Sequence, residues 1–536
     1  MEKLKVLLNY LIKKGQPVFY IGFVSLVALI FNSCHPAQNN LKIPEYGIAM
    51  ELEPEIEINL MIAEEDDEFN TEEYNHIVDN PFMNAWQNPL STFSIDVDHA
   101  SYSNVRRFLN QNQLPPKGAV RIEEMINYFN YDYPEVNGEH PFELVTELGQ
   151  CPWNKNNKLV HIGIQGKQLD YDHLMPSNLT FLIDVSGSMS DMNKLPLVKK
   201  SLNILLNELG DEDKVSIVVY AGAAGLVLPP TPASDRETIR KALKKLKAGG
   251  STAGGEGIEL AYKVTTENKI AEGNNRVILV TDGDFNVGSS STSDMVELIE
   301  SKRKEDIYLT ICGFGMGNYK DGRMEQMSNA GNGNYFYIDN IKEADKVFRK
   351  EMRANMFTIA RDVKIQIEFN PTKVKAYRLI GYENRLLENH DFEDDKKDAG
   401  ELGAGHTVTA LYEIIPAGSN QEVESTSSLR YQKSKPTRIA KNNELVNLNL
   451  RYKPLDSDQS ILINRQVTES DLENNSDDFQ FSAAVAGFGM ILRDSPYRGN
   501  MTFDQVLVIA KNTTNAKSEE RQEFIRLVEV ASLIAE

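Results

Sequence analysis

Strands and helices alternate regularly in the middle third of this 536-residue chain, and this alternation constrains the fold more than any other feature. Four short runs are apolar almost throughout, at residues 179–184, 214–220, 276–281 and 307–314. Patterns of helical period separate or follow them, at residues 195–209, 236–246, 258–265 and 293–304. Short strands that are apolar throughout are typical of a parallel sheet covered on both faces. We therefore predict a doubly wound α/β domain over residues 171–357.

We predict two further folded regions, one on either side of this domain. A single hydrophobic core stops growing at roughly 250–300 residues, and this chain is longer. Residues 91–170 indicate a small N-terminal α/β module, with strands at 93–97, 143–148 and 159–165 and helices at 102–112 and 121–129. Residues 358–536 indicate a β-rich region that becomes helical, with strands at 362–369, 374–379 and 408–415 and helices at 479–492, 503–510 and 519–534.

The N-terminus has the pattern of a secretory signal peptide. Four lysines precede an apolar run at residues 18–31, which is shorter than the ~20 residues of a membrane-spanning helix. Cys34 directly follows Ser33 and resembles the lipidated cysteine of bacterial lipoproteins, although Phe31 stands where Leu is usual and Asn32 is atypical. The resemblance implies a signal peptide at 1–34 and an exported protein whose lipid anchor at Cys34 holds it to a membrane of the bacterial envelope, facing the periplasm or the surface. An uncleaved or ordinarily cleaved signal is the alternative.

Residues 35–90 are acidic and lack a sustained period, so we expect a flexible tether between the membrane and the folded part. The whole chain has a formal charge of −21 at pH 7. Nucleic acid is excluded as a partner on this ground, because binding to phosphates needs clustered Lys and Arg.

Three loops of the predicted central domain carry oxygen donors. In open α/β sheets, ligands bind beyond the carboxyl ends of the strands. One loop directly follows the strand at 179–184, one is a glycine-rich loop before a helix, and one directly follows the strand at 276–281. Their candidate ligands are Asp184, Ser186, Ser188, Thr252 and Asp282. We expect these side chains to meet at one site.

The chemistry of these side chains suits Mg²⁺, which takes oxygen ligands, keeps several waters and needs few carboxylates. The hydroxyls of Ser186 and Ser188 are two residues apart and can face one centre in a tight turn. Thr252 adds a third hydroxyl, and the two aspartates balance the charge directly or through water. Neutral hydroxyls leave the ion electrophilic, which favours a carboxylate from a partner. Alternatively, the two serines cap the following helix and Asp282 opens a turn.

The spacing Asp184-x-Ser186-x-Ser188, then Thr252, then Thr281-Asp282-Gly283 resembles the metal-ion-dependent adhesion site of von Willebrand factor A domains. The resemblance covers the middle third of the chain. It implies a single Mg²⁺, with Mn²⁺ or Ca²⁺ as alternatives, and a protein partner that donates an Asp or Glu carboxylate to the metal.

Segments outside the middle third are similar to the YfbK-like bacterial A-domain proteins. The matching segments are residues 91–98, 104–109 and 120–129 on the N-terminal side and 398–413 on the C-terminal side. This resemblance implies the architecture and the metal site. It does not imply a particular biochemical role.

We weigh three functions. The first is a binding module, not an enzyme, that holds another protein through Mg²⁺. The second is a metal-assisted hydrolase, or an enzyme with Ser186 or Ser188 as nucleophile, which needs a nearby base. No His lies in the three loops, and Glu256 is the only spare acid close to them. The third is a structural or assembly component of an envelope complex.

Other motifs give weaker signals. Asp96, Asp98 and Ser101 could form a second cation site, but capping of the following helix is commoner. The glycines at 313, 315 and 317 lack the spacing of a dinucleotide turn, and the loop at 249–255 lacks the lysine of a phosphate-binding loop, so we expect no nucleotide. A lone His406 is expected to be structural.

Two cysteines remain after Cys34, namely Cys151 and Cys312. Cys312 lies in an apolar run and is expected to be a small buried hydrophobe. A disulfide between the two is an alternative that the sequence leaves open.

Overall fold

The computed structural model describes residues 71–536 apart from 170–174, 251–253, 284, 286–291, 424–434, 473–474 and 514–517. The predicted signal peptide with Cys34, and residues 35–70 of the predicted tether, lie outside the described residues. Within the described part of the chain, no helix is both long enough and apolar enough to cross a membrane.

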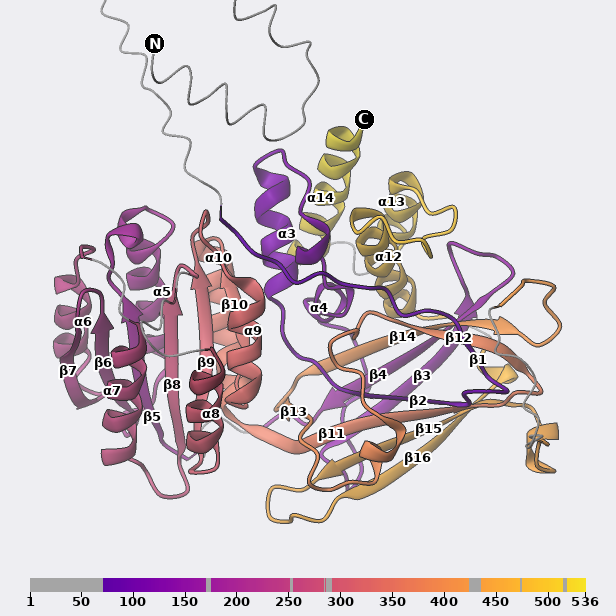
Figure 1. The fold of residues 1–536 in the computed structure, drawn as a ribbon, viewed down its shortest axis with the longest axis horizontal. Coiled ribbons are helices and arrows are strands. Elements are labelled where there is room, and N and C mark those ends of the chain that lie inside the picture. Colours follow the sequence, from indigo (N-terminus) through magenta and orange to yellow (C-terminus); the bar gives the residue numbers. More distant parts are fainter. Residues whose placement is uncertain are drawn as a thin grey trace, which may run out of the picture. The chain divides into compact units, whose positions relative to one another are not determined.

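The middle of the chain forms a six-stranded sheet in the order β10-β9-β8-β5-β6-β7 (Figure 1). All neighbouring pairs are parallel except β6 and β7. The strands are β5 (Ser177–Asp184), β6 (Lys214–Tyr220), β7 (Ala224–Pro232), β8 (Asn274–Thr281), β9 (Ile307–Phe314) and β10 (Tyr335–Ile338). The helices between them are α5 (Leu195–Glu208), α6 (Arg236–Lys245), α7 (Gly254–Glu267), α8 (Thr292–Arg303) and α9 (Asp321–Ala330). The predicted doubly wound α/β fold is confirmed.

Helices cover both faces of this sheet. Every position of its central strands β5 and β8 is therefore buried. Along β5, Phe181 and Ile183 point to one face and join a hydrophobic cluster with α5 and α6. Leu182, between them, points to the other face and packs in a cluster with α7, α8 and α9. This period of two, with apolar residues on both sides, is the physical reason for the continuous apolar runs in the sequence.

Strand β7 was not predicted from the sequence. It contains Pro229, Pro230 and Pro232, which argue against a strand because proline lacks an N–H for the ladder. The structure accommodates them because β7 is an edge strand that pairs with β6 alone. α9 and β10 were also missing from the sequence-based prediction.

A helical segment ends the central domain and leads into the β-rich region. It consists of α10 (Ile341–Asp345), a π-helical turn (Lys346–Glu351) and α11 (Met352–Met356). Strand β11 (Thr358–Phe369) follows after one residue.

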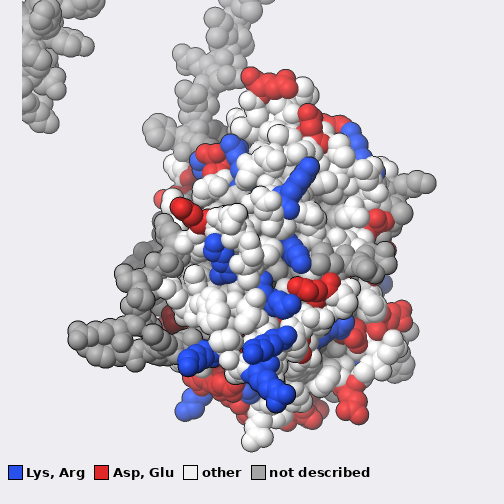
Figure 2. All heavy atoms as spheres, turned by 90° about the vertical axis from the view of Figure 1, so that its right-hand side faces the viewer, with Lys and Arg blue, Asp and Glu red and all other residues white. Residues whose placement is uncertain are grey.

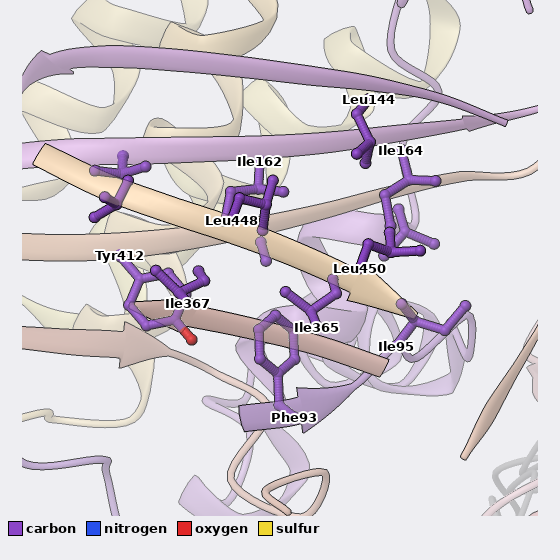
Figure 3. Packing of buried hydrophobic residues seen from close by; sticks show 14 of the residues in the cluster. Phe93, Ile95, Leu144, Ile162, Ile164, Ile365, Ile367, Tyr412, Leu448 and Leu450 are labelled. Atoms are coloured by element: carbon purple, nitrogen blue, oxygen red, sulfur yellow. The ribbon is translucent and has the colours of Figure 1, made fainter. Parts of the chain in front are cut away.

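Two further sheets face each other in the β-rich region. One has the order β1-β12-β14-β4-β3, and the other has the order β13-β11-β15-β16, with β2 also paired to β11. Their strands are β1 (Met83–Asn84), β2 (Leu90–Ser94), β3 (Phe142–Gln150), β4 (Lys158–Gly166), β12 (Val374–Ile380), β13 (Gly400–Gly403), β14 (Thr407–Pro416), β15 (Glu444–Lys453) and β16 (Ile461–Thr468). Figure 3 shows the apolar core between them, where side chains of β3 and β4 such as Leu144 and Ile162 approach Ile365 of β11 and Leu448 of β15.

Strands from both ends of the chain share these sheets. β4 pairs with β14 along its whole length, and β2 pairs with β11. The segment 91–170 therefore has the predicted strands, but they do not form a sheet of their own. The sequence pattern indicates which residues form a strand, but it does not indicate which strand lies beside it. The strands of the two segments pair because an unpaired edge in either segment would leave a row of unsatisfied backbone groups.

A second core is helical. It is built from helices of both ends of the chain: α3 (Ala100–Asn110), α4 (Ile122–Asn127), α12 (Asp477–Leu492), α13 (Phe503–Lys511) and α14 (Glu519–Ala535). Phe129, Phe481 and Phe524 contact one another edge to face at its centre. Such aromatic pairs add about 0.5–1.5 kcal/mol beyond the area that they bury.

The predicted tether extends too far, since residues 71–90 pack on the folded part. Glu72 forms an ion pair with Arg107 at 2.8 Å, and Asp79 pairs with Arg493. The amide of Asn80 donates to the carbonyl of Gly381 at 2.8 Å. The acidic composition predicted a solvated segment, but these acids have buried cationic partners whose positions depend on the tertiary structure.

Figure 2 shows one face of the molecule, which is the right-hand side of Figure 1. Lys and Arg side chains lie across its middle and lower part, acidic side chains border them, and uncharged surface lies between. The negative net charge of the chain is therefore not gathered into one continuous acidic field on this face.

Candidate metal centre

The topology brings two of the predicted site residues to one edge of the central sheet. β5 and β8 are parallel neighbours, and Ile183 lies opposite Val280. Asp184 is the last residue of β5, and Asp282 directly follows the last residue of β8. Both aspartates are fully buried. The two carboxylates therefore stand at the carboxyl edge of the sheet, as the sequence predicts.

The loop after β5 gathers oxygen atoms within a short span. The hydroxyl oxygens of Ser186 and Ser188 are 3.0 Å apart, and the backbone N–H of Ser186 donates to Oδ1 of Asp184 at 2.8 Å. Oδ2 of Asp184 is buried and makes no hydrogen bond of normal geometry, while the buried hydroxyl of Tyr220 lies close enough to the carboxyl to lower its pKa. An unpaired carboxylate oxygen in a buried site costs free energy, so this atom is a ready ligand for a cation. The two serines do not cap the next helix, α5, which begins at Leu195.

The glycine-rich loop is tied to the loop after β5 by backbone hydrogen bonds. The N–H of Gly187 donates to the carbonyl of Gly250 at 3.0 Å, and the N–H of Gly249 donates to the carbonyl of Val185 at 2.8 Å. Thr252 lies outside the described residues. Glu256, the spare acid, lies exposed in the first turn of α7.

A buried lysine at the site was not found by sequence analysis. The ammonium of Lys194 lies 3.2 Å from Oδ2 of Asp282 and 3.7 Å from a carboxylate oxygen of Asp191. Lys194 is 6% exposed. Nothing in its local pattern distinguishes it from the surface lysines of the chain, because its burial depends on the loop after β9.

Electrostatics at the site favour a cation. Burial, helped by repulsion from the Asp282 carboxylate, raises the pKa of Asp184 to about 6, although hydrogen bonds from Ser186 and Tyr220 act in the opposite direction. A bound cation would relieve both the burial penalty and the repulsion.

The donor set is poor in carboxylates and rich in hydroxyls, which suits a hard divalent ion that retains water. Among the described residues, no group of three or more His, Cys, Asp or Glu side chains could hold a metal ion. The centre described above has only two carboxylates, and its other donors are hydroxyls. Asp184, Ser186, Ser188 and Asp282 could therefore hold the ion, and Thr252 is expected to complete the set.

The other candidate cation site is wrong. Asp96 pairs with Arg385 at 3.0 Å, and Asp98 accepts a hydrogen bond from the backbone N–H of Tyr335 at 2.9 Å. The helix-capping alternative is wrong too, since α3 is preceded by His99 with no side-chain cap. These acids bind groups that are more than 230 residues away in sequence, which local spacing could not predict.

The glycines at the end of β9 and in the loop after it serve close packing. A Cβ atom at Gly313 would lie 2.1 Å from the hydroxyl oxygen of Tyr319. The backbone N–H of Gly317 donates to Oε1 of Glu72 at 2.8 Å. The need for small residues here explains a motif that only partly resembles a dinucleotide turn.

The remaining candidates are a half-buried histidine and two buried cysteines. Burial lowers the pKa of His406 to about 4. Cys151 and Cys312 are buried free thiols that belong to different hydrophobic clusters, so the disulfide alternative is not formed.

Comparison with known proteins places these features in a family. The model for "von Willebrand factor type A domain" matches residues 178–350, the model for "von Willebrand factor" matches 68–161, and the model for "Uncharacterized protein YfbK, C-terminal" matches 354–534. The "Uncharacterized protein YfbK" of Escherichia coli (strain K12) is 41% identical over 473 residues, which are 86% of this chain and 81% of that protein. This chain belongs to the YfbK family.

This YfbK family member also has more distant similarities. Human inter-alpha-trypsin inhibitor heavy chain H3 is 29% identical over 225 residues, which are 40% of this chain and 23% of that protein. A solved structure titled "von Willebrand factor type A from Catenulispora acidiphila" is 16% identical, covers 74% of this chain and 92% of its own, and has a TM-score of 0.41.

Proposed function

We propose that this protein binds one divalent cation, Mg²⁺ in the first place, and uses it to hold a carboxylate of a partner protein. The ligands are Asp184, Ser186, Ser188, Thr252 and Asp282. The observation that carries the proposal is the pair of hydroxyl oxygens 3.0 Å apart next to the buried carboxylate of Asp184, one oxygen of which makes no hydrogen bond of normal geometry. Mn²⁺ and Ca²⁺ are the alternative ions.

Exposure at the site favours a ligand that approaches from outside. Ser188 is exposed, whereas Ser186 and Asp184 are buried beneath it. An ion held from below by buried oxygens can take a further ligand on its open side. Neutral hydroxyls do little to quench the charge of the ion, so an anionic oxygen is the preferred sixth ligand. Proteins with A domains often mediate protein–protein interactions, which fits this chemistry.

Binding is favoured over hydrolysis because the described residues of the site include no positioned base. General-base catalysis needs an acceptor within about 3 Å of the attacking group. The three loops contain no His, and Glu256 is exposed in the first turn of α7. The buried carboxylates of Asp184 and Asp282 balance the charge of the cation, so neither is expected to act as the base.

Isothermal titration of the full chain with Mg²⁺ and Mn²⁺ tests the metal site. Asp184→Ala should abolish binding, and Ser188→Ala should weaken it strongly. Ser190→Ala is the matched control, because Ser190 is an exposed hydroxyl in the same loop. Equal affinity in wild type, Asp184→Ala and Ser188→Ala would refute the site.

A second experiment tests partner binding. Chemical cross-linking in intact membranes should give a partner adduct with wild type in Mg²⁺, and the adduct should be lost in EDTA and in Ser188→Ala. An adduct that survives both treatments would show that the partner does not use the metal.

We also propose that the protein is exported and anchored to an envelope membrane by lipid on Cys34. Cells grown with labelled palmitate should incorporate the label into wild type and not into Cys34→Ala. Unlabelled wild-type protein, or membrane retention of Cys34→Ala equal to that of wild type, would contradict the anchor.

A further inference from the structure

Lys194 is held in place with more precision than an ordinary ion-pairing lysine. Its side chain is 6% exposed, and its ammonium lies 3.2 Å from Oδ2 of the fully buried Asp282. A buried lysine loses hydration and side-chain freedom, so it persists only where its charge has a specific partner. The partner here is one of the two carboxylates of the metal centre.

The loop after β9 has a shape that admits this lysine. Gly315 has a φ of +75°, and a Cβ atom there would lie 2.4 Å from Cε and 2.6 Å from Cγ of Lys194. The buried hydroxyl of Tyr337 donates to the carbonyl of Gly315 at 2.5 Å and fixes this backbone. Glycine at 315 thus leaves space for the aliphatic part of Lys194, which directs the ammonium toward Asp282.

Charge balance shows what the lysine does. The two buried aspartates contribute two negative charges, Lys194 contributes one positive charge, and the serine hydroxyls are neutral. The third acid near the lysine, Asp191, is 55% exposed and is screened by water. A divalent cation therefore leaves the buried centre with one net positive charge, whereas the same centre without Lys194 would be neutral.

We propose that Lys194 sets the ligand preference of the metal centre by keeping its charge positive after the cation has bound. This inference rests on the proposed metal site and deepens it. The lysine weakens the cation's affinity, because its ammonium repels the incoming ion, and it strengthens the affinity for an external carboxylate. A centre built in this way binds its metal loosely and gains stability when an acidic side chain of a partner joins it.

The first test compares the full-length wild type with Lys194→Met and Lys194→Arg by titration with Mn²⁺. Lys194→Met removes the charge and keeps the aliphatic part, so Mn²⁺ should bind about tenfold more tightly. Lys194→Arg keeps the charge and should bind Mn²⁺ with nearly wild-type affinity. Equal or weaker Mn²⁺ binding by Lys194→Met would overturn the inference.

The second test uses acetate as the simplest carboxylate. Acetate that joins bound Mn²⁺ displaces water, which lowers the relaxation enhancement of water protons. Wild type should require several-fold less acetate for this effect than Lys194→Met. Equal acetate dependence of the two proteins would overturn the role in ligand preference.

Control variants separate this inference from the proposed metal site. If Asp184→Ala leaves Mn²⁺ binding intact, the metal site itself is refuted. If Asp184→Ala abolishes binding and Lys194→Met behaves as wild type, only the role of Lys194 is refuted. If Lys194→Met does not fold, the shorter polar variant Lys194→Gln is measured in the same way, and Mn²⁺ binding by Lys194→Gln that is no tighter than that of wild type would overturn the inference.

Discussion

Arg106 on α3 lies 2.8 Å from Oε2 of Glu343 on α10, which joins the N-terminal segment to the last helical segment of the A domain. The same guanidinium pairs with Asp339 at 2.5 Å and with Glu523 of α14 at 3.0 Å. Arg106 is 3% exposed, and these partners come from two separate parts of the chain. One side chain thus ties the A domain to the helical core.

Replacement of Arg106 by Met should destabilise the protein strongly. Removal of one partner from a buried ion pair leaves uncompensated charges and costs about 3–5 kcal/mol. Urea unfolding followed by circular dichroism measures this loss. Lys117→Met is the control, because Lys117 and its partner Asp494 are both exposed and the pair contributes little. Equal stability of the two variants would argue against Arg106 as a link between the A domain and the helical core.

A chain that begins at residue 354 should not fold by itself, although a family model matches residues 354–534. Its β14 would lack β4, and its β11 would lack β2, so two sheets would have open edges. We expect aggregation or a broad thermal transition, measured by calorimetry and size-exclusion chromatography. Cooperative unfolding of a soluble monomer would contradict the shared sheets, and the full chain serves as the reference.

His161 should make the protein sensitive to acid. It is fully buried on β4, and burial lowers its pKa to about 3. In the unfolded chain it titrates near 6.5, so the unfolded state takes up a proton first as the pH falls. Stability from this group is complete above about pH 6.5 and is lost at about 1.4 kcal/mol per pH unit as the pH falls toward 3.

Urea unfolding at pH 7.5 and pH 5 measures the effect of His161. Wild type should lose about 2 kcal/mol more than His161→Phe between these values. The exposed His390 provides the control, and His390→Gln should keep the wild-type slope. An unchanged acid slope in His161→Phe would show that the buried imidazole is not the cause.

Gly315→Ala should reduce stability by roughly 2 kcal/mol. Part of this cost is the left-handed backbone at Gly315, and part is the contact of the new methyl group with Lys194. Thermal melting in EDTA measures it without a contribution from metal. Gly418→Ala is the matched control, because nothing lies within 4 Å of a Cβ atom there and its φ is ordinary. A melting temperature shared by both variants would contradict the packing of Lys194 on Gly315.

Local patterns predict those parts of the fold that local physics controls. The strands β5, β6, β8 and β9 were predicted within two residues, because burial on both faces requires an apolar run. β7 was missed because its prolines are tolerated only at an edge, and edge position is a property of the whole sheet. The strands of the N-terminal segment were predicted, but their partners in the C-terminal segment were not.

The candidate site divides in the same way. The sequence by itself determined that Asp184, Ser186, Ser188 and Asp282 lie at or just after the ends of two buried strands, because each residue type and its spacing are local. Only the tertiary structure decided that Lys194 pairs with Asp282 and that Arg106 joins three segments. These partners are distant in sequence, and a charge can be buried only where folding brings its counter-charge within a few ångströms.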